Sequence, residues 1–177
     1  DCRYPDKHLA GVGVALKLVQ ALCGRAGKDQ WLPAFLKLAA IGTLADVVPL
    51  RGQNRILAKN GLLVLGEARR PGVRALREVC GHAPGSPIGS GQVVYGLAPR
   101  INAAGRMGQA QAALDMLLAK DMETARPLAV FLDQENAARR QEEDRIEGLF
   151  AENFIHVPAV ETIKTNATFQ PRSLGHE

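Results

Sequence analysis

The most apolar part of the chain runs from Leu36 to Leu50, and it constrains the fold more than any other segment. Asp46 is the only charged residue in this stretch after Lys37. A buried carboxylate needs compensation, so Asp46 must pair with a cation, accept hydrogen bonds, cap a helix or bind a metal. The ends of apolar segments are where α/β sheets place ligand-binding groups. Asp46 is therefore a candidate site residue.

A second segment, from Arg100 to Gly108, combines two arginines and an asparagine with several small residues. We expect Pro99 to stop a short helix and to present this segment as a loop. Guanidinium groups of Arg100 and Arg106 suit phosphate oxygens, and Asn102 adds a neutral donor and acceptor. The alternative is that both arginines form structural salt bridges.

Apolar residues recur at helical spacing along most of the chain. Asp29 and Asp121 are suited to cap helices, and the helix after Asp121 is expected to be long, with a polar middle around Asn136. Pro127 predicts a late start or a kink in that helix. The shorter helices are predicted over residues 9–22, 30–42 (with Pro33 in its first turn), 54–65, 73–79, 90–97 and 109–119.

Four arginines cluster near the break between the third and fourth predicted helices: Arg69, Arg70, Arg74 and Arg77. A solvated helix surface is favoured over a nucleic-acid contact for this cluster.

Four runs in order carry a resemblance to a known family. They are Y-P-D-K-H-L-A-G-V-G-V (4–14), G-T-L-A-D-V-V-P-L-R-G-Q-N-R (42–55), G-L-A-P-R-I-N-A-A-G-R-M-G (96–108) and E-N-A-A-R-R-Q-E-E (135–143). Together they resemble the RecJ-type single-stranded-DNA-specific exonucleases of the DHH phosphoesterase superfamily. The resemblance covers the chain from about Cys2 to about Leu149.

The resemblance implies an α/β fold: the C-terminal part of a doubly wound DHH-type domain over residues 1–68, followed by a mostly helical segment. That segment, residues 69–120, holds the R-I-N-A-A-G-R run, and a connecting helix over 121–150 leads toward a second, DHHA1-type domain. The tail, 151–177, is unassigned. The family's early aspartate motif and Asp-His-His triplet belong upstream of residue 4. We therefore expect a central fragment of a longer enzyme.

The implied activity is metal-dependent 5′-to-3′ hydrolysis of single-stranded DNA in repair and recombination, with two divalent ions, manganese or magnesium. Asp46 matches the family's later metal-binding aspartate. Arg106 matches the arginine that meets DNA phosphate near the scissile bond, and Arg100 and Asn102 support it in binding nucleic acid. Asn54 and Arg55 are interpreted as scaffolding for the Asp46 segment. The isolated chain is expected to be inactive, because it lacks the upstream metal ligands.

Two alternatives remain open. One is a non-catalytic scaffold on a DHH fold that binds nucleic acid or protein, and the other is an oligonucleotide phosphodiesterase of the same superfamily. The presence of Asp46 favours an enzyme, and the long connecting helix favours the exonuclease branch. Single-stranded DNA is the implied partner, with a repair helicase or a single-strand-binding protein as further candidates.

Composition sets broader limits. Aromatic residues make up 5% of the chain, which argues against base-stacking platforms, and a net charge of +4 favours polyanions only mildly. Three cysteines without a CxxC pair indicate reduced thiols and no disulfide framework. No apolar run reaches membrane-spanning length, so we expect a soluble cytoplasmic protein without membrane contact.

Overall fold

The computed structural model describes residues 3–67, 69–83, 85–106 and 110–154, and side chains in these ranges except those of 106 and 150–154. All regular elements in these ranges are helical. The strands expected of an α/β domain are not found there, so that part of the fold prediction is not confirmed. By internal contacts the chain forms two units, Asp1–Arg140 and Gln141–Glu177. No helix in the described ranges is long and apolar enough to cross a membrane.

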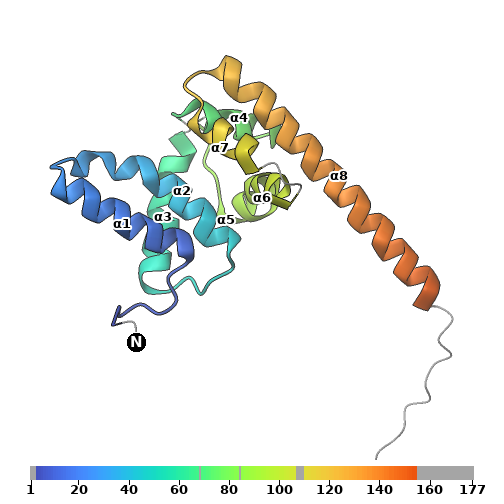
Figure 1. Cartoon of the computed structure of the whole chain (residues 1–177), viewed down its shortest axis with the longest axis horizontal. Coiled ribbons are helices and arrows are strands. Elements are labelled where there is room, and N and C mark those ends of the chain that lie inside the picture. Colours follow the sequence, from blue (N-terminus) through green and yellow to red (C-terminus); the bar gives the residue numbers. More distant parts are fainter. Residues whose placement is uncertain (1–2, 68, 84, 107–109, 155–177) are drawn as a thin grey trace, which may run out of the picture. The chain divides into compact units, whose positions relative to one another are not determined.

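The elements follow one another with short connections (Figure 1). They are α1 (Gly11–Arg25), the 3-10 helix η1 (Asp29–Trp31), α2 (Pro33–Ala45), α3 (Gly52–Glu67), α4 (Pro71–Val79), α5 (Ser90–Gln92), the π-helix η2 (Val93–Leu97), α6 (Ala98–Arg106), α7 (Ala110–Leu118) and α8 (Met122–Phe154).

Helices α2 and α3 form the most extensive helix pair in the first unit. Gly61 of α3 sits directly against Ala40 and the Leu36 carbonyl of α2, where a Cβ atom would collide with both. The absence of a side chain at Gly61 therefore sets how closely the two helices approach. On the other side, α1 packs on α2, and Leu16, Ala39 and Leu57 make a small apolar cluster where α1, α2 and α3 meet.

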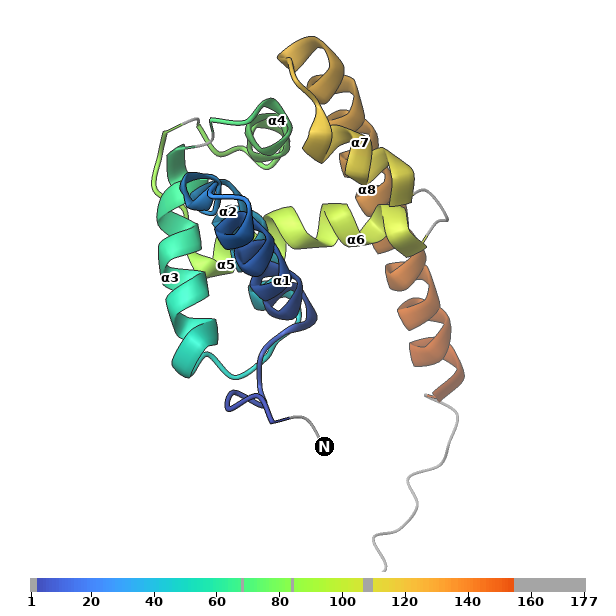
Figure 2. The same cartoon turned by 60° about the vertical axis from the view of Figure 1, so that its left-hand side comes forward.

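The main core joins the later helices to α2 and α3. Figure 2 shows α6 running from the side of α2 and α3 to the side of α7. Ala104 of α6 and Met116 of α7 are fully buried in this core. The helix α4 lies so close to α7 that a Cβ atom at Gly72 would collide with the Met116 carbonyl.

The predicted helices are confirmed, but two details are wrong. Asp29 does not cap an α-helix: it lies in η1, and α2 begins at Pro33 without a side-chain cap. The larger difference concerns the segment around Asn102. The segment from Arg100 to Arg106 is not a loop, because helix α6 begins at Ala98 and runs through Pro99 to Arg106. Proline is tolerated in the first turn of a helix, where its missing N–H has no intrahelical partner. The turn before it is a π-helix, which the sequence pattern did not predict.

The long helix begins earlier than expected. The Asp121 carboxylate accepts a hydrogen bond from the Thr124 backbone N–H at 2.8 Å, as predicted for an N-cap. Helix α8 consequently starts at Met122, ahead of Pro127, and the expectation of a late start is wrong. Asn136 is buried, and its Oδ1 atom lies 3.5 Å from Arg139 Nη2, as a polar middle of the helix requires.

The arginine cluster near residue 70 is not uniformly solvated. Arg77 is fully buried, and burial lowers the pKa of its guanidinium. Its Nη1 donates to the Leu65 and Gly66 carbonyls at 2.9 and 2.6 Å. Its Nη2 donates to the Ala83 and Ser86 carbonyls at 3.0 and 2.7 Å, and to Ser86 Oγ at 2.9 Å. The side chain thus fastens the end of α3, Ala83 and Ser86 to α4. The surface interpretation is wrong for this residue.

Glu78, the residue after Arg77, links α4 to α8. The Glu78 carboxylate accepts hydrogen bonds from Arg74 Nε at 3.0 Å and Arg126 Nε at 3.2 Å. Desolvation alone would raise the pKa of Glu78, but the two arginines outweigh it and lower the pKa below its ordinary value.

Candidate functional site

Asp46 lies at the C-terminal end of α2, and it is exposed. The expectation that its carboxylate is buried is wrong, because the chain leaves the core at this residue. No hydrogen bond or ion pair engages this carboxylate within the described part of the chain. It is therefore available to a ligand.

The residue after Asp46 has an unusual backbone conformation. Val47 has a φ of 52°, and its side chain is 85% exposed. A β-branched residue in the left-handed region is sterically strained, and a helix end of this kind usually has glycine there. The turn that carries Asp46 is therefore strained, and the segment that follows it is fixed by contacts with other parts of the chain.

Those contacts come from residues 4–8 and from the start of α3, a group that we name the Asp6–Asn54 clamp. The amide of buried Asn54 donates to the Pro49 carbonyl at 3.1 Å and to the His8 carbonyl at 2.6 Å. Asp6 Oδ2 accepts the Gln53 backbone N–H at 3.2 Å, and the Tyr4 hydroxyl donates to Gln53 Oε1 at 2.8 Å. The clamp fixes the segment between α2 and α3 at Pro49 and at the start of α3.

The scaffolding role predicted for Asn54 is confirmed by these bonds. Arg55 is exposed, and its side chain makes no hydrogen bond or ion pair within the described ranges, so its predicted role stays a prediction. Sequence reasoning missed the part of Tyr4 and Asp6, although both belong to a run that carries the resemblance. Gly52, with a φ of 47°, would place a Cβ atom 3.2 Å from Asp6 Oδ2, which is a second sign of how closely the clamp is packed.

The three residues predicted to bind nucleic acid all lie on helix α6, but their surroundings differ. Arg100 is largely buried, with Nε 2.8 Å from Asp133 Oδ1 of α8 and Nη1 donating to the Gly96 carbonyl at 2.8 Å. These bonds support the structural alternative for Arg100. Asn102 is exposed on α6. Arg106 ends α6, and its side chain lies outside the described residues, so its role stays a prediction.

The small residues of the same run have a packing role. Ala103 and Ala104 are fully buried, where they let α6 approach its neighbours, and they do not face a ligand. Helix α2 contacts both η2 and α6. The elements that bear Asp46 and Asn102 are thus packed together, although no contact between these two side chains is found among the described residues.

The described residues do not by themselves fit a metal ion. A divalent cation takes several oxygen or nitrogen ligands. No three His, Cys, Asp or Glu side chains of the described residues gather closely enough to hold one. Asp46 offers a single carboxylate.

Comparison with known proteins finds relatives that match most of this chain. No family model matches the sequence. Curated relatives are bacterial exonucleases specific for single-stranded DNA, at 41% identity over 152 residues in Dickeya dadantii and 43% over 140 residues in Bacillus subtilis. These alignments cover 80% and 79% of this chain.

Those relatives are named RecJ, and solved RecJ structures are similar to this chain in backbone fold. RecJ from Thermus thermophilus in complex with Mg²⁺ superposes with a TM-score of 0.72 at 40% identity, over 81% of this chain and 22% of the other. A manganese-bound RecJ gives 0.74 at 40% identity, over 85% and 38%. The resemblance to RecJ is confirmed: the chain is similar to a segment of RecJ. It spans 26% of the Dickeya protein and 17% of the Bacillus protein.

Proposed function

We propose that this chain forms part of a 5′-to-3′ single-stranded-DNA exonuclease that acts in repair and recombination by divalent-metal-dependent phosphodiester hydrolysis. The observation that carries the proposal is the exposed, unengaged carboxylate of Asp46 on a strained turn, which the Asp6–Asn54 clamp holds in place. A strained conformation kept by specific contacts is typical of functional sites. The similarity to RecJ supplies the reaction class.

In this proposal Asp46 contributes one ligand to a metal site whose other ligands lie outside the described residues. Manganese or magnesium ions, when bound, activate water and stabilise charge on the leaving oxygen. Arg106 and Asn102 are assigned to DNA phosphate. Arg100 acts through position: its ion pair with Asp133 fixes α6 against α8 and so orients the other two residues.

The same proposal includes a finer fold and setting. Residues 1–68 complete a doubly wound DHH-type α/β domain, residues 69–120 carry the α6 segment, and residues 121–150 connect to a second domain. The protein works in the cytoplasm on single-stranded DNA, with a repair helicase or a single-strand-binding protein as partner. The chain alone is expected to be inactive, since its described residues do not complete a metal site.

A chimaera tests the proposal. Residues 4–143 of this chain replace the matching segment of Thermus thermophilus RecJ, and manganese-dependent nucleotide release from 5′-labelled single-stranded DNA is measured. We expect the chimaera to cleave, Asp46→Asn to abolish cleavage while DNA affinity is kept, and Arg106→Gln to weaken affinity or slow cleavage.

Asp115→Asn is the matched control, because Asp115 is an exposed carboxylate that accepts a hydrogen bond from Gln111 Nε2 at 2.7 Å, within its own helix. It should cleave like the unaltered chimaera. Normal cleavage by the Asp46→Asn chimaera would show that Asp46 is structural and would refute the metal assignment.

A further inference from the structure

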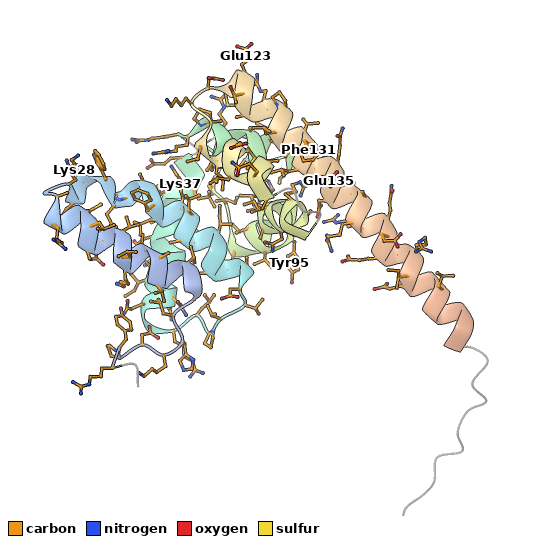
Figure 3. All side chains as sticks on the ribbon, in the orientation of Figure 1. Lys28, Lys37, Tyr95, Glu123, Phe131 and Glu135 are labelled. Atoms are coloured by element: carbon orange, nitrogen blue, oxygen red, sulfur yellow. The ribbon has the colours of Figure 1, made fainter. Side chains whose placement is uncertain are left out.

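A recess with a volume of about 440 Å³ opens between α2, the end of α3 and the residues before α4. Its apolar walls come from α2 and α3, and its charged residues are one lysine, one glutamate and two arginines. We name it the Lys37 recess, after the α2 residue labelled in Figure 3. It is lined by Pro33, Ala34, Lys37, Val64, Glu67, Arg69 and Arg70.

Lys37 is the unusual member of the group. Only 5% of the residue is exposed, and no hydrogen bond or ion pair joins its ammonium group to an acceptor in the described part of the chain. Lysine is almost never buried to this extent unless it is paired. Burial lowers the pKa of Lys37, and the nearby charge of Arg70 lowers it further, against an opposing effect of Glu67.

The single carboxylate of the recess is already engaged. Glu67 Oε2 lies 3.0 Å from Arg69 Nε, which leaves Lys37 and Arg70 without a counter-charge among the residues that line the recess. Three cations against one carboxylate give the recess two uncompensated positive charges. Glu67, Arg69 and Arg70 are exposed, so the net positive charge of the recess faces solvent and is accessible to an anion.

We propose that the Lys37 recess binds a phosphate group. A phosphate carries enough charge to balance both free cations, its oxygens match the forked donors of arginine, and lysine is a common point-charge partner for it. Pro33 and Val64 supply apolar wall surface beside these cations. A nucleotide and a DNA strand both present this chemistry.

The site is separate from the turn that carries Asp46 and does not depend on the function proposed above. Lys37 precedes Asp46 by nine residues of α2, which corresponds to about 13 Å of helix rise. The recess can therefore be tested in the 177-residue chain without any catalytic activity.

The test is calorimetric titration of the whole chain with inorganic phosphate, thymidine 5′-monophosphate and a short oligothymidylate, at constant ionic strength set with chloride. We expect saturable binding that Lys37→Met weakens at least about tenfold, since it removes a charge-assisted contact. Lys59→Met is the matched control, because Lys59 is an exposed α3 lysine outside the recess, and it should bind as the wild type does.

A second variant, Arg70→Gln, tests the recess without changing the buried Lys37, and it should weaken binding to a similar extent. Circular dichroism checks that both variants keep the helix content of the wild type. Binding of the monophosphate but not of the oligothymidylate identifies a nucleotide site, and tighter binding of the oligothymidylate identifies a strand site. Absence of saturable binding in the wild type, or an equal loss in Lys59→Met, would overturn the proposal.

Discussion

Replacing Arg77 by methionine tests how much the hydrogen bonds of this buried side chain stabilise the first unit. Methionine keeps much of the side-chain volume but removes five hydrogen bonds, four to the carbonyls of Leu65, Gly66, Ala83 and Ser86 and one to the Ser86 hydroxyl. The Leu65 carbonyl is buried and loses its donor outright, while the other acceptors are partly accessible and can recruit water.

The magnitude follows from these two groups. An orphaned buried carbonyl costs about 1–3 kcal/mol, and each of the partly accessible bonds contributes roughly 0.5–1 kcal/mol. Relief of the desolvation of the guanidinium offsets part of this sum, so we expect a loss of about 3–4 kcal/mol in the free energy of unfolding. That is a large share of the stability typical of a domain, about 5–15 kcal/mol.

Urea denaturation followed by circular dichroism measures the loss. Arg77→Lys, which keeps the charge and some donors, should recover part of the stability. Arg74→Met, which breaks only an exposed ion pair with Glu78, should cost less than about 1 kcal/mol. Surface changes usually alter the free energy of unfolding by no more than about 0.5 kcal/mol. If the free energy of unfolding of Arg77→Met differs from that of the wild type by no more than this, then Arg77 is the solvated residue that the sequence pattern indicated, and the reasoning fails.

Three shorter predictions follow from other contacts. Because the pKa of Glu78 is lowered in the folded state, its carboxylate stabilises the protein fully above the unfolded pKa of about 4.5, and this contribution is lost as the pH falls through the folded pKa. The melting temperatures of the wild type and Glu78→Gln should therefore differ at pH 6 and converge in acid. A difference that stays constant with pH would contradict this. Gly72→Ala should lower the free energy of unfolding by about 1–3 kcal/mol, because the new methyl group meets the Met116 carbonyl, and urea titration against Gly91→Ala, where no atom lies within 4 Å, checks it. Val47→Asn should raise stability by roughly 0.5–1 kcal/mol, because asparagine tolerates the left-handed region; a loss in the same titration would show that Val47 is not strained.

The sequence predicted the helices well where one apolar stripe per helix decides the structure, as in α1, α3 and α7. It failed at α6, because Pro99 was interpreted as a stop although it occupies a first turn, where proline is tolerated. Sequence neighbours could not show this, since the π-helix before Pro99 has no distinct pattern.

The sequence was sufficient to select the candidate site residues, but not to predict their exposure or their hydrogen-bond partners. Asp46 was identified by its lone charge, but its exposure depends on where the chain leaves the core, which composition does not encode. Arg100 carries the same side chain as Arg106, and only the position of Asp133, 33 residues further on, shows that it is engaged internally. Arg77 illustrates the same limit, because its acceptors come from two separate segments.

The Asp6–Asn54 clamp has a kinetic consequence. Three of its four bonds join residues that are separated by 46, 47 and 49 positions in the sequence. Closing a loop of that length costs roughly 3 kcal/mol of chain entropy. Contacts of this range form after local helices during folding. The turn at Asp46 therefore acquires its shape late, once α1, α2 and α3 have brought the two sequence segments together. Local opening of residues 4–8 would release that turn while the apolar core stays intact, so the site can be lost without global unfolding.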